Sequence, residues 1–229
     1  MAEESPVEEL AVDDTTRIRR EAHHQVRDRA ALHAILDDAL VAHVGVVRDG
    51  APLVLPFACA RDGDTVLLHG STGSGLLRVA TGDAVCVTVT HLDGLVFART
   101  TFDSSMRYRS VVVHGTATEV TGEEKATALT LLSEHLFPGR TSELREPTTK
   151  EVAATMVLRV PLDRVSVKVD EGPPEVDPDD HEPRSVWAGV VPLRLAAEDP
   201  VTAPDVPAEV PVPVSVHRTI RARGRDRSR

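Results

Sequence analysis

The sequence predicts a mainly β protein in which antiparallel strands close into a small barrel with flanking helices. Valine-rich runs alternate apolar and polar residues, tight turns separate the runs, and few stretches have the periodicity of a long helix. Because closure removes exposed strand edges, six or seven such strands most easily form a barrel. The expected strands are 42–48, 52–60, 65–69, 84–91, 95–101, 108–120 and 155–169.

Short turns set the pairing of these strands. Asp49-Gly50 separates the first two, and an Asp-Gly pair between β-rich runs is a strong hairpin signal. Residues 61–64 (RDGD) lead by a second turn into the third strand. Residues 92–94 (LDG) are expected to turn the chain between the fourth and fifth strands. The pattern therefore predicts antiparallel neighbours.

Two longer helices are expected beside the barrel. Residues 28–41 have their apolar side chains on one face, and Asp28 is in position to cap the N-terminus. Residues 122–136 follow Thr121, with Glu124 three positions later, which is typical of a capping box.

The length of 229 residues suits one domain, which we expect to occupy 15–195. Residues 1–14 are rich in acidic side chains, and a disordered tail is expected there. Residues 196–229 are proline-rich and then arginine-rich, and a second disordered tail is expected. The arginine-rich end is either a solvated tail, which we favour, or an arm for nucleic acid or another anionic surface.

Composition excludes several classes of protein. The formal net charge is −10 and the aromatic residues are one Trp, one Tyr and four Phe, so no nucleic-acid partner is expected. Two cysteines, Cys59 and Cys86, are too few for a disulfide framework, which suits a cytoplasmic protein. No apolar run is long enough to span a membrane, and the acidic N-terminus is unlike a secretory signal. No membrane partner is therefore expected.

The segment 69–75 (HGSTGSG) lies between a strand and a short helix expected at 74–80. Its glycines allow a ligand to approach the backbone closely, and Ser71, Thr72 and Ser74 offer hydroxyl groups. A turn of this kind before a helix suits a phosphate group. The Lys-Ser/Thr pair of a Walker loop is absent, and a plain turn is the alternative.

Two other segments have side chains suited to ligand binding. Arg107 and Arg109 flank the single tyrosine near the start of a strand, where a guanidinium can bind phosphate or carboxylate. The alternative is a cross-strand ion pair with an acidic residue. Trp187 lies in an apolar island, 186–193, within a stretch rich in Pro and Asp. It either anchors that stretch on the domain or closes over a ring-shaped ligand.

Four motifs occur in a fixed order: HGSTGSG at 69–75, VCVTVTHLDG at 85–94, SMRYRSVVVHG at 105–115 and WAGVVPL at 187–193. Together they resemble the pyridoxamine 5′-phosphate oxidase-like flavoproteins, specifically the nitroimidazole-reductase-related group of FMN-binding split barrels. The resemblance extends over the whole of the expected domain. It implies a six-stranded antiparallel split β-barrel, a homodimer, and FMN in a groove at the subunit interface.

The same resemblance implies a set of flavin contacts. The second strand would lie along the isoalloxazine ring, the glycine-rich loop would hold the ribityl chain and phosphate, and the tryptophan would approach from the partner subunit. The implied cofactor-binding residues are Val54, Leu55, Pro56, Phe57, His69, Gly70, Ser71, Thr72, Ser74, Arg109, Ser110 and Trp187. No catalytic side chain and no metal ligand is assigned.

The sequence departs from the oxidases at two places in these motifs. Gly75 and Leu76 stand where the oxidases have Arg-Lys in the phosphate loop, so Arg78 or Arg109 would have to supply positive charge. Arg194 lacks the following histidine of the Arg-x-His that grips pyridoxal phosphate in the oxidases. We therefore do not expect pyridoxamine phosphate oxidation.

The function implied is that of an FMN-dependent oxidoreductase that transfers a hydride or electrons between reduced flavin and a small organic substrate. The flavin performs the redox chemistry, and the protein binds and orients it. Arg109 is the candidate for stabilising the reduced flavin anion. Two alternatives remain: a flavin-binding module without turnover, and a barrel that uses a deazaflavin coenzyme or haem.

The histidines bear on the haem alternative. Scattered histidines are more often core or surface residues than ligands, which we expect of His23, His24, His43, His91 and His114. His69 differs because it opens the phosphate loop, and a redox role for it is a lesser alternative.

Overall fold

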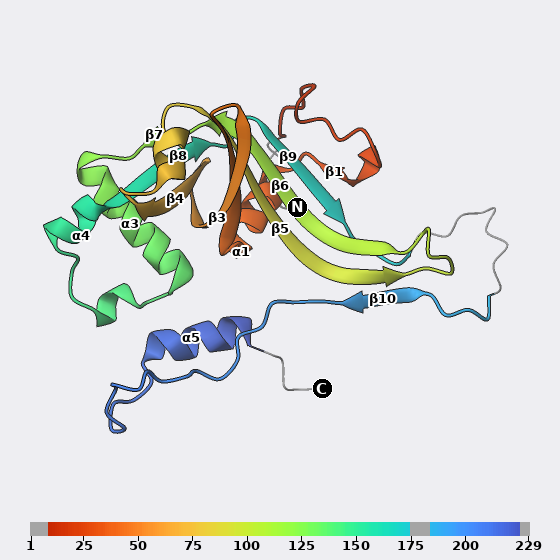
Figure 1. Cartoon of the computed structure of the whole chain (residues 1–229). Coiled ribbons are helices and arrows are strands. Elements are labelled where there is room, and N and C mark those ends of the chain that lie inside the picture. The colour runs from red at the N-terminus through yellow and green to blue at the C-terminus, as the bar shows by residue number, and fades with distance from the viewer. Residues whose placement is uncertain (1–8, 175–183, 225–229) are drawn as a thin grey trace, which may run out of the picture.

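The structure is a computed structural model that describes residues 9–174 and 184–224. Its core is a ten-stranded sheet in the order β1-β9-β6-β5-β2-β3-β4-β8-β7, with β10 paired to β5 (Figure 1). All the pairs are antiparallel. The strands are β1 (Gln25–Val26), β2 (Val41–Arg48), β3 (Ala51–Asp62), β4 (Thr65–Ser71), β5 (Ala84–Phe97), β6 (Ser105–Thr116), β7 (Thr118–Glu119), β8 (Thr155–Pro161), β9 (Val165–Asp170) and β10 (Gly189–Pro192).

The predicted fold class, a mainly β antiparallel barrel with flanking helices, is confirmed. The number of strands differs because two predicted strands each divide, whereas the predicted strands 84–91 and 95–101 join into the single strand β5. Residues 108–120 contribute to both β6 and β7, and residues 155–169 contribute to β8 and β9. The short strands β1 and β10 add to the count, and neither has enough alternating residues to be recognised in the sequence.

β3 joins the two halves of the sheet. Its residues 51–58 pair with β2, and its residues 59–62 pair with β4. β4 then pairs with β8 along its full length. The sheet therefore divides beside residues 51–58, which is the opening that characterises a split barrel.

The turn between β2 and β3 is the predicted Asp-Gly turn. Asp49 and Gly50 have φ angles of 51° and 77°, both in the left-handed region. Tight two-residue hairpin turns of type I′ need positive φ at both positions, which explains why this dipeptide identified the hairpin.

The turn predicted at 92–94 is wrong. β5 continues through it to Phe97, and the register with β6 shifts between Leu92 and Gly94. Asp93 is the extra residue of a β-bulge, which bends a strand without ending it. Gly94 is required because β10 lies close: a β-carbon there would lie 2.9 Å from Cγ1 of Val190.

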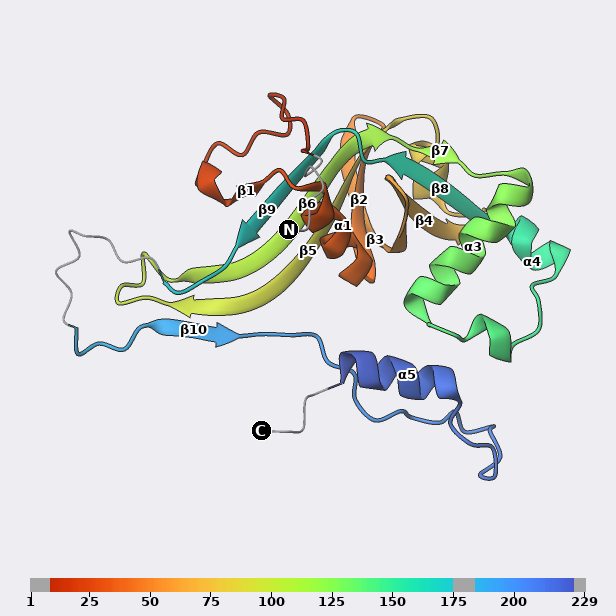
Figure 2. The ribbon, with the colours of Figure 1, turned by 180° about the vertical axis from the view of Figure 1, so that it is seen from behind.

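α1 (Arg29–Asp38) packs against β3, β5 and β6 (Figure 2). The carboxylate of Asp28 accepts a hydrogen bond from the amide of Ala30 at 2.9 Å, so the predicted cap is confirmed. Leu32, Ile35 and Leu36 are buried in the main hydrophobic core. This helix therefore fills the space that the curved sheet encloses.

α3 (Gly122–Leu136) covers a second, smaller cluster on β3, β4 and β8. The capping box predicted for it is wrong, because the side chain of Thr121 makes no capping hydrogen bond and Glu124 pairs with Arg159 at 3.3 Å. A capping box occurs instead between Thr148 and Glu151 at α4 (Thr149–Ala154), a helix that the sequence reading missed.

Residues 9–14 do not behave as the expected disordered tail. Leu10 is 3% exposed in the main core, and its amide donates to the carbonyl of Arg27 at 2.7 Å. The carboxylate of Asp13 accepts from Arg164 at 3.0 Å. An apolar residue within an acidic run was sufficient to attach this segment. Residues 1–8 lie outside the described part of the chain.

Residues 184–224, named here the C-terminal arm, contain β10 and α5 (Val214–Arg223). Disorder was expected from residue 196, yet Ser215 is 3% exposed and its hydroxyl donates to Glu143 at 2.6 Å. Val216 and Ile220 line a cavity of about 280 Å³ together with Phe137. The proline-rich stretch before α5 concealed this helix in the sequence. The predicted tail at 225–229 lies outside the described residues.

The structure also bears on the predictions about membrane spans and cysteines, within the residues that it describes. No described helix is both long and apolar enough to cross a membrane. Both cysteines are free thiols. Burial raises the pKa of the Cys59 thiol to about 11, so this sulfur stays protonated near neutral pH.

Candidate functional site

The first part of the candidate site is the open edge of β3. Val54 and Leu55 are exposed by 58% and 41%, although they lie in the middle of a long strand. Their backbone pairs with β2 on one side, and on the other side no described strand pairs with residues 51–58. Amide and carbonyl groups on that side can therefore bind a polar ligand edge.

The glycine-rich loop lies beside this edge. A β-carbon on Gly70 would lie 3.6 Å from Cε1 of Phe57 and 2.8 Å from Cδ1 of Leu77. Leu77, on α2 (Gly75–Ala80), is fully buried, so it has no room to move. Only glycine fits at position 70, and its contacts fix the loop against β3.

Hydrogen bonds within the chain fix the shape of the loop. The amide of Thr72 donates to the carbonyl of Ala154 at 3.0 Å. The hydroxyl oxygen of Ser71 accepts from the amide of Gly73 at 3.1 Å, and that of Ser74, the N-cap of α2, accepts from the amide of Leu77 at 3.4 Å. Because both serines act as acceptors, their O–H groups remain available to donate to a ligand.

Two arginines bring positive charge to the loop. Nη1 of Arg48, at the end of β2, would lie 3.6 Å from a β-carbon on Gly75. Nη2 of Arg78, on α2, donates to the carbonyl of Gly73 at 3.4 Å. Arg78 was one of the two sequence candidates for this role. Arg48 was missed, because it lies far from the loop in the sequence and only the hairpin brings it close.

Arg109 has a different setting from the one expected for an anion-binding residue. Its Nε and Nη2 donate to the carboxylate of Asp93 at 2.9 and 3.0 Å, and Nη2 lies 3.6 Å from Asp38. The hydrogen bond to Asp93 raises the pKa of this guanidinium. The cross-strand ion pair, the alternative left open by the sequence, is therefore what the structure contains. The bulge in β5 brings Asp93 to this position.

The guanidinium of Arg107 is likewise paired with groups of the same chain. It is 8% exposed, pairs with Asp170, and donates through Nε to the carbonyl of Gly172 at 3.1 Å. It ties β6 to the end of β9.

Ser110 and Trp187 lie away from the loop within one chain. β5 and β2 separate the strand of Ser110 from β3, a distance of about 14 Å at the usual strand spacing. β4 and β10 lie at opposite sides of the molecule in both ribbon views (Figures 1 and 2). The structure therefore joins the β3 edge to the loop, and it leaves Arg109, Ser110 and Trp187 outside that group.

Trp187 is 66% exposed. Its ring lies 6.2 Å from that of Phe97 and covers Gly189, where a β-carbon would lie 2.6 Å from Cζ2. Other exposed apolar side chains on the same strands or on the arm are Leu92, Leu95, Met106, Val191 and Leu195. Val191, Leu95 and Met106 are neighbours across paired strands, and exposed apolar side chains that gather in this way are typical of an interaction site.

His69 lies on β4, two residues before the strand ends at Ser71. Its Nδ1 is buried and has no hydrogen-bond partner among the described residues. Burial lowers the pKa of this imidazole, so the ring is neutral at pH 7. The neutral ring, with one nitrogen unpaired, is therefore better suited to binding a ligand than to forming an ion pair.

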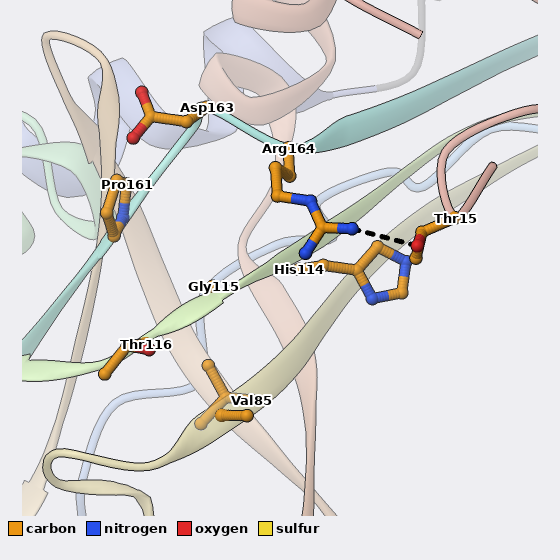
Figure 3. A pocket seen from close by; sticks show the side chains of 9 residues that line it. Thr15, Val85, His114, Gly115, Thr116, Pro161, Asp163 and Arg164 are labelled. Carbon is orange, nitrogen blue, oxygen red and sulfur yellow. Dashed lines mark hydrogen bonds between the residues drawn. The ribbon is translucent and has the colours of Figure 1, made fainter. Parts of the chain in front are cut away.

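A separate cavity of about 480 Å³ lies at the other end of β5 and β6 (Figure 3). His114, Thr116 and Arg164 line it, and Arg164 donates to the hydroxyl of Thr15 at 2.9 Å across it. None of the predicted flavin contacts lines this cavity. It contains one of the strand histidines for which no ligand role was expected.

The remaining histidines give no stronger metal candidate among the described residues. Glu21, His24 and Asp170 lie close enough to share an ion. Both carboxylates already face cations, since Glu21 accepts from Lys168 at 3.4 Å and Asp170 pairs with Arg107. These existing ion pairs weaken the case for a divalent metal at this cluster.

Comparisons with known proteins bear on the whole domain. A family model described as pyridoxamine 5′-phosphate oxidase matches residues 28–169. A solved structure of the FAD and heme binding protein from Mycobacterium smegmatis is 43% identical with a TM-score of 0.82, covering 86% of this chain and 97% of that one. No curated protein matches.

Two further solved structures are similar. The flavocytochrome Anf3 from Azotobacter vinelandii is 35% identical, with a TM-score of 0.85 over 90% of this chain and 97% of that one. A putative 5-nitroimidazole antibiotic resistance protein from Bacteroides thetaiotaomicron is 25% identical, with a TM-score of 0.55 over 63% and 86% of the two chains.

Proposed function

Because the chain belongs to the pyridoxamine 5′-phosphate oxidase family, whose model matches residues 28–169, we propose that it is a flavin-binding redox protein. The observation that carries the proposal is the contact between the glycine-rich loop and the open edge of β3. A β-carbon on Gly70 would lie 3.6 Å from the ring of Phe57, so hydroxyl donors and an open strand edge adjoin one another. A flavin needs both, one for its phosphate and one for its ring.

Different residues near the loop bind different parts of the flavin. Ser71 and Ser74 donate their O–H groups to the phosphate, and Arg48 and Arg78 balance its charge. The open backbone of 54–57 binds the polar edge of the isoalloxazine ring. The flavin, when bound, supplies the hydride or electron transfer, and the protein supplies binding and orientation.

The exposed apolar arm supports a homodimer in which two chains share each site. Trp187 is 66% exposed in one chain and lies away from that chain's loop. A second copy brings an arm to the flavin held by the first copy's loop, and burying Trp187, Phe97 and Leu195 stabilises the pair. Ser110 belongs to this second half of the site.

FMN is the flavin expected from the sequence, and FAD is the alternative favoured by one relative. The Mycobacterium smegmatis protein, 43% identical, is named for FAD. Two arginines beside the loop suit either one phosphate or two. Mass spectrometry of the nucleotide released from the native protein distinguishes the two.

The test of the phosphate site replaces both arginines. In Arg48→Gln/Arg78→Gln, the Kd for the flavin rises by roughly 10-fold or more, because each charge-assisted hydrogen bond contributes about 1.5–3 kcal/mol. Arg145→Gln is the matched control, since that exposed arginine pairs with Glu151. Flavin fluorescence quenching measures Kd. An unchanged Kd in the double variant contradicts the assignment.

A second candidate function adds haem to the flavin. Two relatives, 43% and 35% identical, are a FAD and heme binding protein and a flavocytochrome. The buried, unpartnered Nδ1 of His69 suits a haem ligand. Electrons would then pass between flavin and iron instead of to a small organic substrate. A Soret band in the native protein supports this function, and a spectrum with flavin bands alone supports the first.

A further inference from the structure

The cavity in Figure 3 is formed by four segments that are far apart in the sequence. They are the start of β5, the end of β6, the turn between β8 and β9, and the N-terminal segment at Thr15. The volume of about 480 Å³ lies within the range of roughly 300–1,000 Å³ that is usual for small-molecule sites. No residue assigned to the flavin lines this cavity, so a ligand bound here would be additional to the flavin.

Most of the cavity wall is apolar. Val85, which is 5% exposed, lies on one side and Pro161 on another. Between them is Gly115, where a β-carbon would lie 2.9 Å from Cγ1 of Val160 and 3.7 Å from Cδ of Pro161. Glycine at this position therefore allows β8 to pack directly against β6. Walls of this kind suit the hydrocarbon part of a ligand.

The guanidinium of Arg164 is held in one orientation at the cavity. Its Nε donates to the carboxylate of Asp13 at 3.0 Å, and its Nη2 donates to the hydroxyl of Thr15 at 2.9 Å. Hydrogen bonds from the amide of Thr16, and then from that of Thr15 and from Arg164, lower the pKa of Asp13 to about 2. Asp13 is therefore ionised near neutral pH, and Arg164 keeps this partner.

One terminal nitrogen of Arg164 remains for a ligand. Its Nη1 makes no hydrogen bond to any residue that the structure describes, and Figure 3 shows the guanidinium directed from the β8–β9 turn toward His114. Because the other two nitrogens already hold the side chain, little further freedom is lost when Nη1 binds a ligand.

His114 supplies a second donor. Its half-buried ring makes no hydrogen bond within residues 9–174 and 184–224, whereas the rings of His33 and His91 are each hydrogen-bonded. Either tautomer of an imidazole has an N–H group that can donate. The amide of His114 donates to the carbonyl of Arg164 at 2.9 Å, which fixes the two residues relative to one another.

These features select one class of ligand. A guanidinium and an imidazole N–H beside apolar walls match a carboxylate on a hydrocarbon body. A phosphate dianion is less suitable, because the carboxylate of Asp13 is close by and repels a double charge more strongly than a single one. Asp163 also lines the cavity, but its carboxylate points away from Arg164 and His114 in Figure 3.

We propose that this cavity is a second binding site of the chain, for a small monocarboxylic acid with an apolar body. Nη1 of Arg164 and the ring of His114 donate to the carboxylate. Val85 and Pro161 contact the hydrocarbon part.

The test titrates the purified full-length protein with benzoate and measures the Kd by calorimetry. Wild type should bind benzoate saturably, and in Arg164→Gln the Kd should rise at least roughly tenfold, because a charge-assisted hydrogen bond is lost. His114→Phe keeps a ring of similar size without the donor, and its Kd should rise by a smaller factor. Arg145→Gln, the matched control at an exposed ion pair with Glu151, should keep the wild-type Kd.

A second variant separates the cavity from the attachment of the N-terminal segment by Arg164. Ala84 is exposed at the cavity wall, so Ala84→Trp fills the space and leaves the pair of Arg164 with Asp13 intact. The benzoate Kd of this variant should also rise at least roughly tenfold, since the hydrocarbon part no longer fits.

Amide signals in nuclear magnetic resonance spectra locate the bound benzoate. The aromatic ring should shift the signals of 84–85 and 114–116 and leave those of 69–75 unchanged. The proposal is overturned if wild type shows no saturable binding, if Ala84→Trp keeps the wild-type Kd, or if the signals of 69–75 shift instead. Tighter binding of phenyl phosphate than of benzoate would also contradict it, because the site would then prefer a dianion.

Discussion

The corner around loop 69–75 and the C-terminal arm differ in how completely each is packed. At the corner, Leu68 and Leu77 are fully buried, and the loop is held by hydrogen bonds to Ala154 and within itself. On the arm, Trp187 and Leu195 are 66% and 74% exposed. The corner is fully packed within one chain, whereas the arm leaves apolar side chains exposed to solvent in one chain.

This difference explains why the predicted flavin contacts fall into two groups. The β3 edge and the loop adjoin one another in one chain, while Ser110 and Trp187 lie away from them. The shared site that we propose in a dimer would account for both observations. The following predictions test that contrast.

The largest effect is expected at the corner. Leu77→Ala removes a fully buried side chain that packs on Gly70, and it should lower the free energy of unfolding by about 2–5 kcal/mol. Leu195→Ala, on the arm and 74% exposed, should change it by less than about 0.5 kcal/mol in the monomer. Urea unfolding monitored by circular dichroism measures both. Equal effects would remove the contrast.

A smaller effect is expected from Arg109. Its partners Asp93 and Asp38 make it a structural residue, so Arg109→Gln should cost about 0.5–1 kcal/mol of stability. A double-mutant cycle with Asp93→Asn measures the coupling between the two. The flavin Kd should stay at the wild-type value. A large rise in Kd with unchanged stability would return Arg109 to the flavin site.

The smallest effect is local and depends on pH. Hydrogen bonds from Ser215 and the guanidinium of Arg140 lower the pKa of Glu143 to about 2, so the carboxylate form holds α5 in place. Docking of α5 is therefore complete above pH 4.5 and is lost as pH falls through about 2. Amide signals of α5 in nuclear magnetic resonance spectra follow this change.

The control for the acid transition is Glu143→Gln. Its neutral amide removes the titrating group, so α5 signals should no longer change between pH 4.5 and 2. If they change as in wild type, another group releases the helix.

The sequence was sufficient for the fold class, for the first hairpin and for the position of the loop between a strand and a short helix. Alternating valines and the Asp49-Gly50 turn identified the β2–β3 hairpin, because local backbone geometry alone decides it. The short helix expected at 74–80 is α2, which begins one residue later because Ser74 caps it. The turn predicted at residues 92–94 was wrong because an Asp-Gly pair suits a β-bulge as well as a hairpin turn. Only the approach of β10 selects the bulge over the turn.

Long-range contacts explain what the sequence missed. Arg48 reaches the loop because a hairpin folds back, and Asp93 reaches Arg109 because a bulge bends β5. The attachment of α5 depends on one serine meeting Glu143, a pairing of residues far apart in the chain. No local sequence pattern encodes these contacts, because each joins residues that are far apart in the chain.

The central claim is that each flavin lies between the corner of one chain and the arm of its partner. Heterodimers with two different tags test it, combining an Arg48→Gln/Arg78→Gln chain with a Trp187→Ala chain. Each parent homodimer should bind flavin weakly. The heterodimer should regain one site per dimer with the wild-type Kd, because one corner and one arm remain intact and face each other. A heterodimer that binds no better than its parents would contradict the claim.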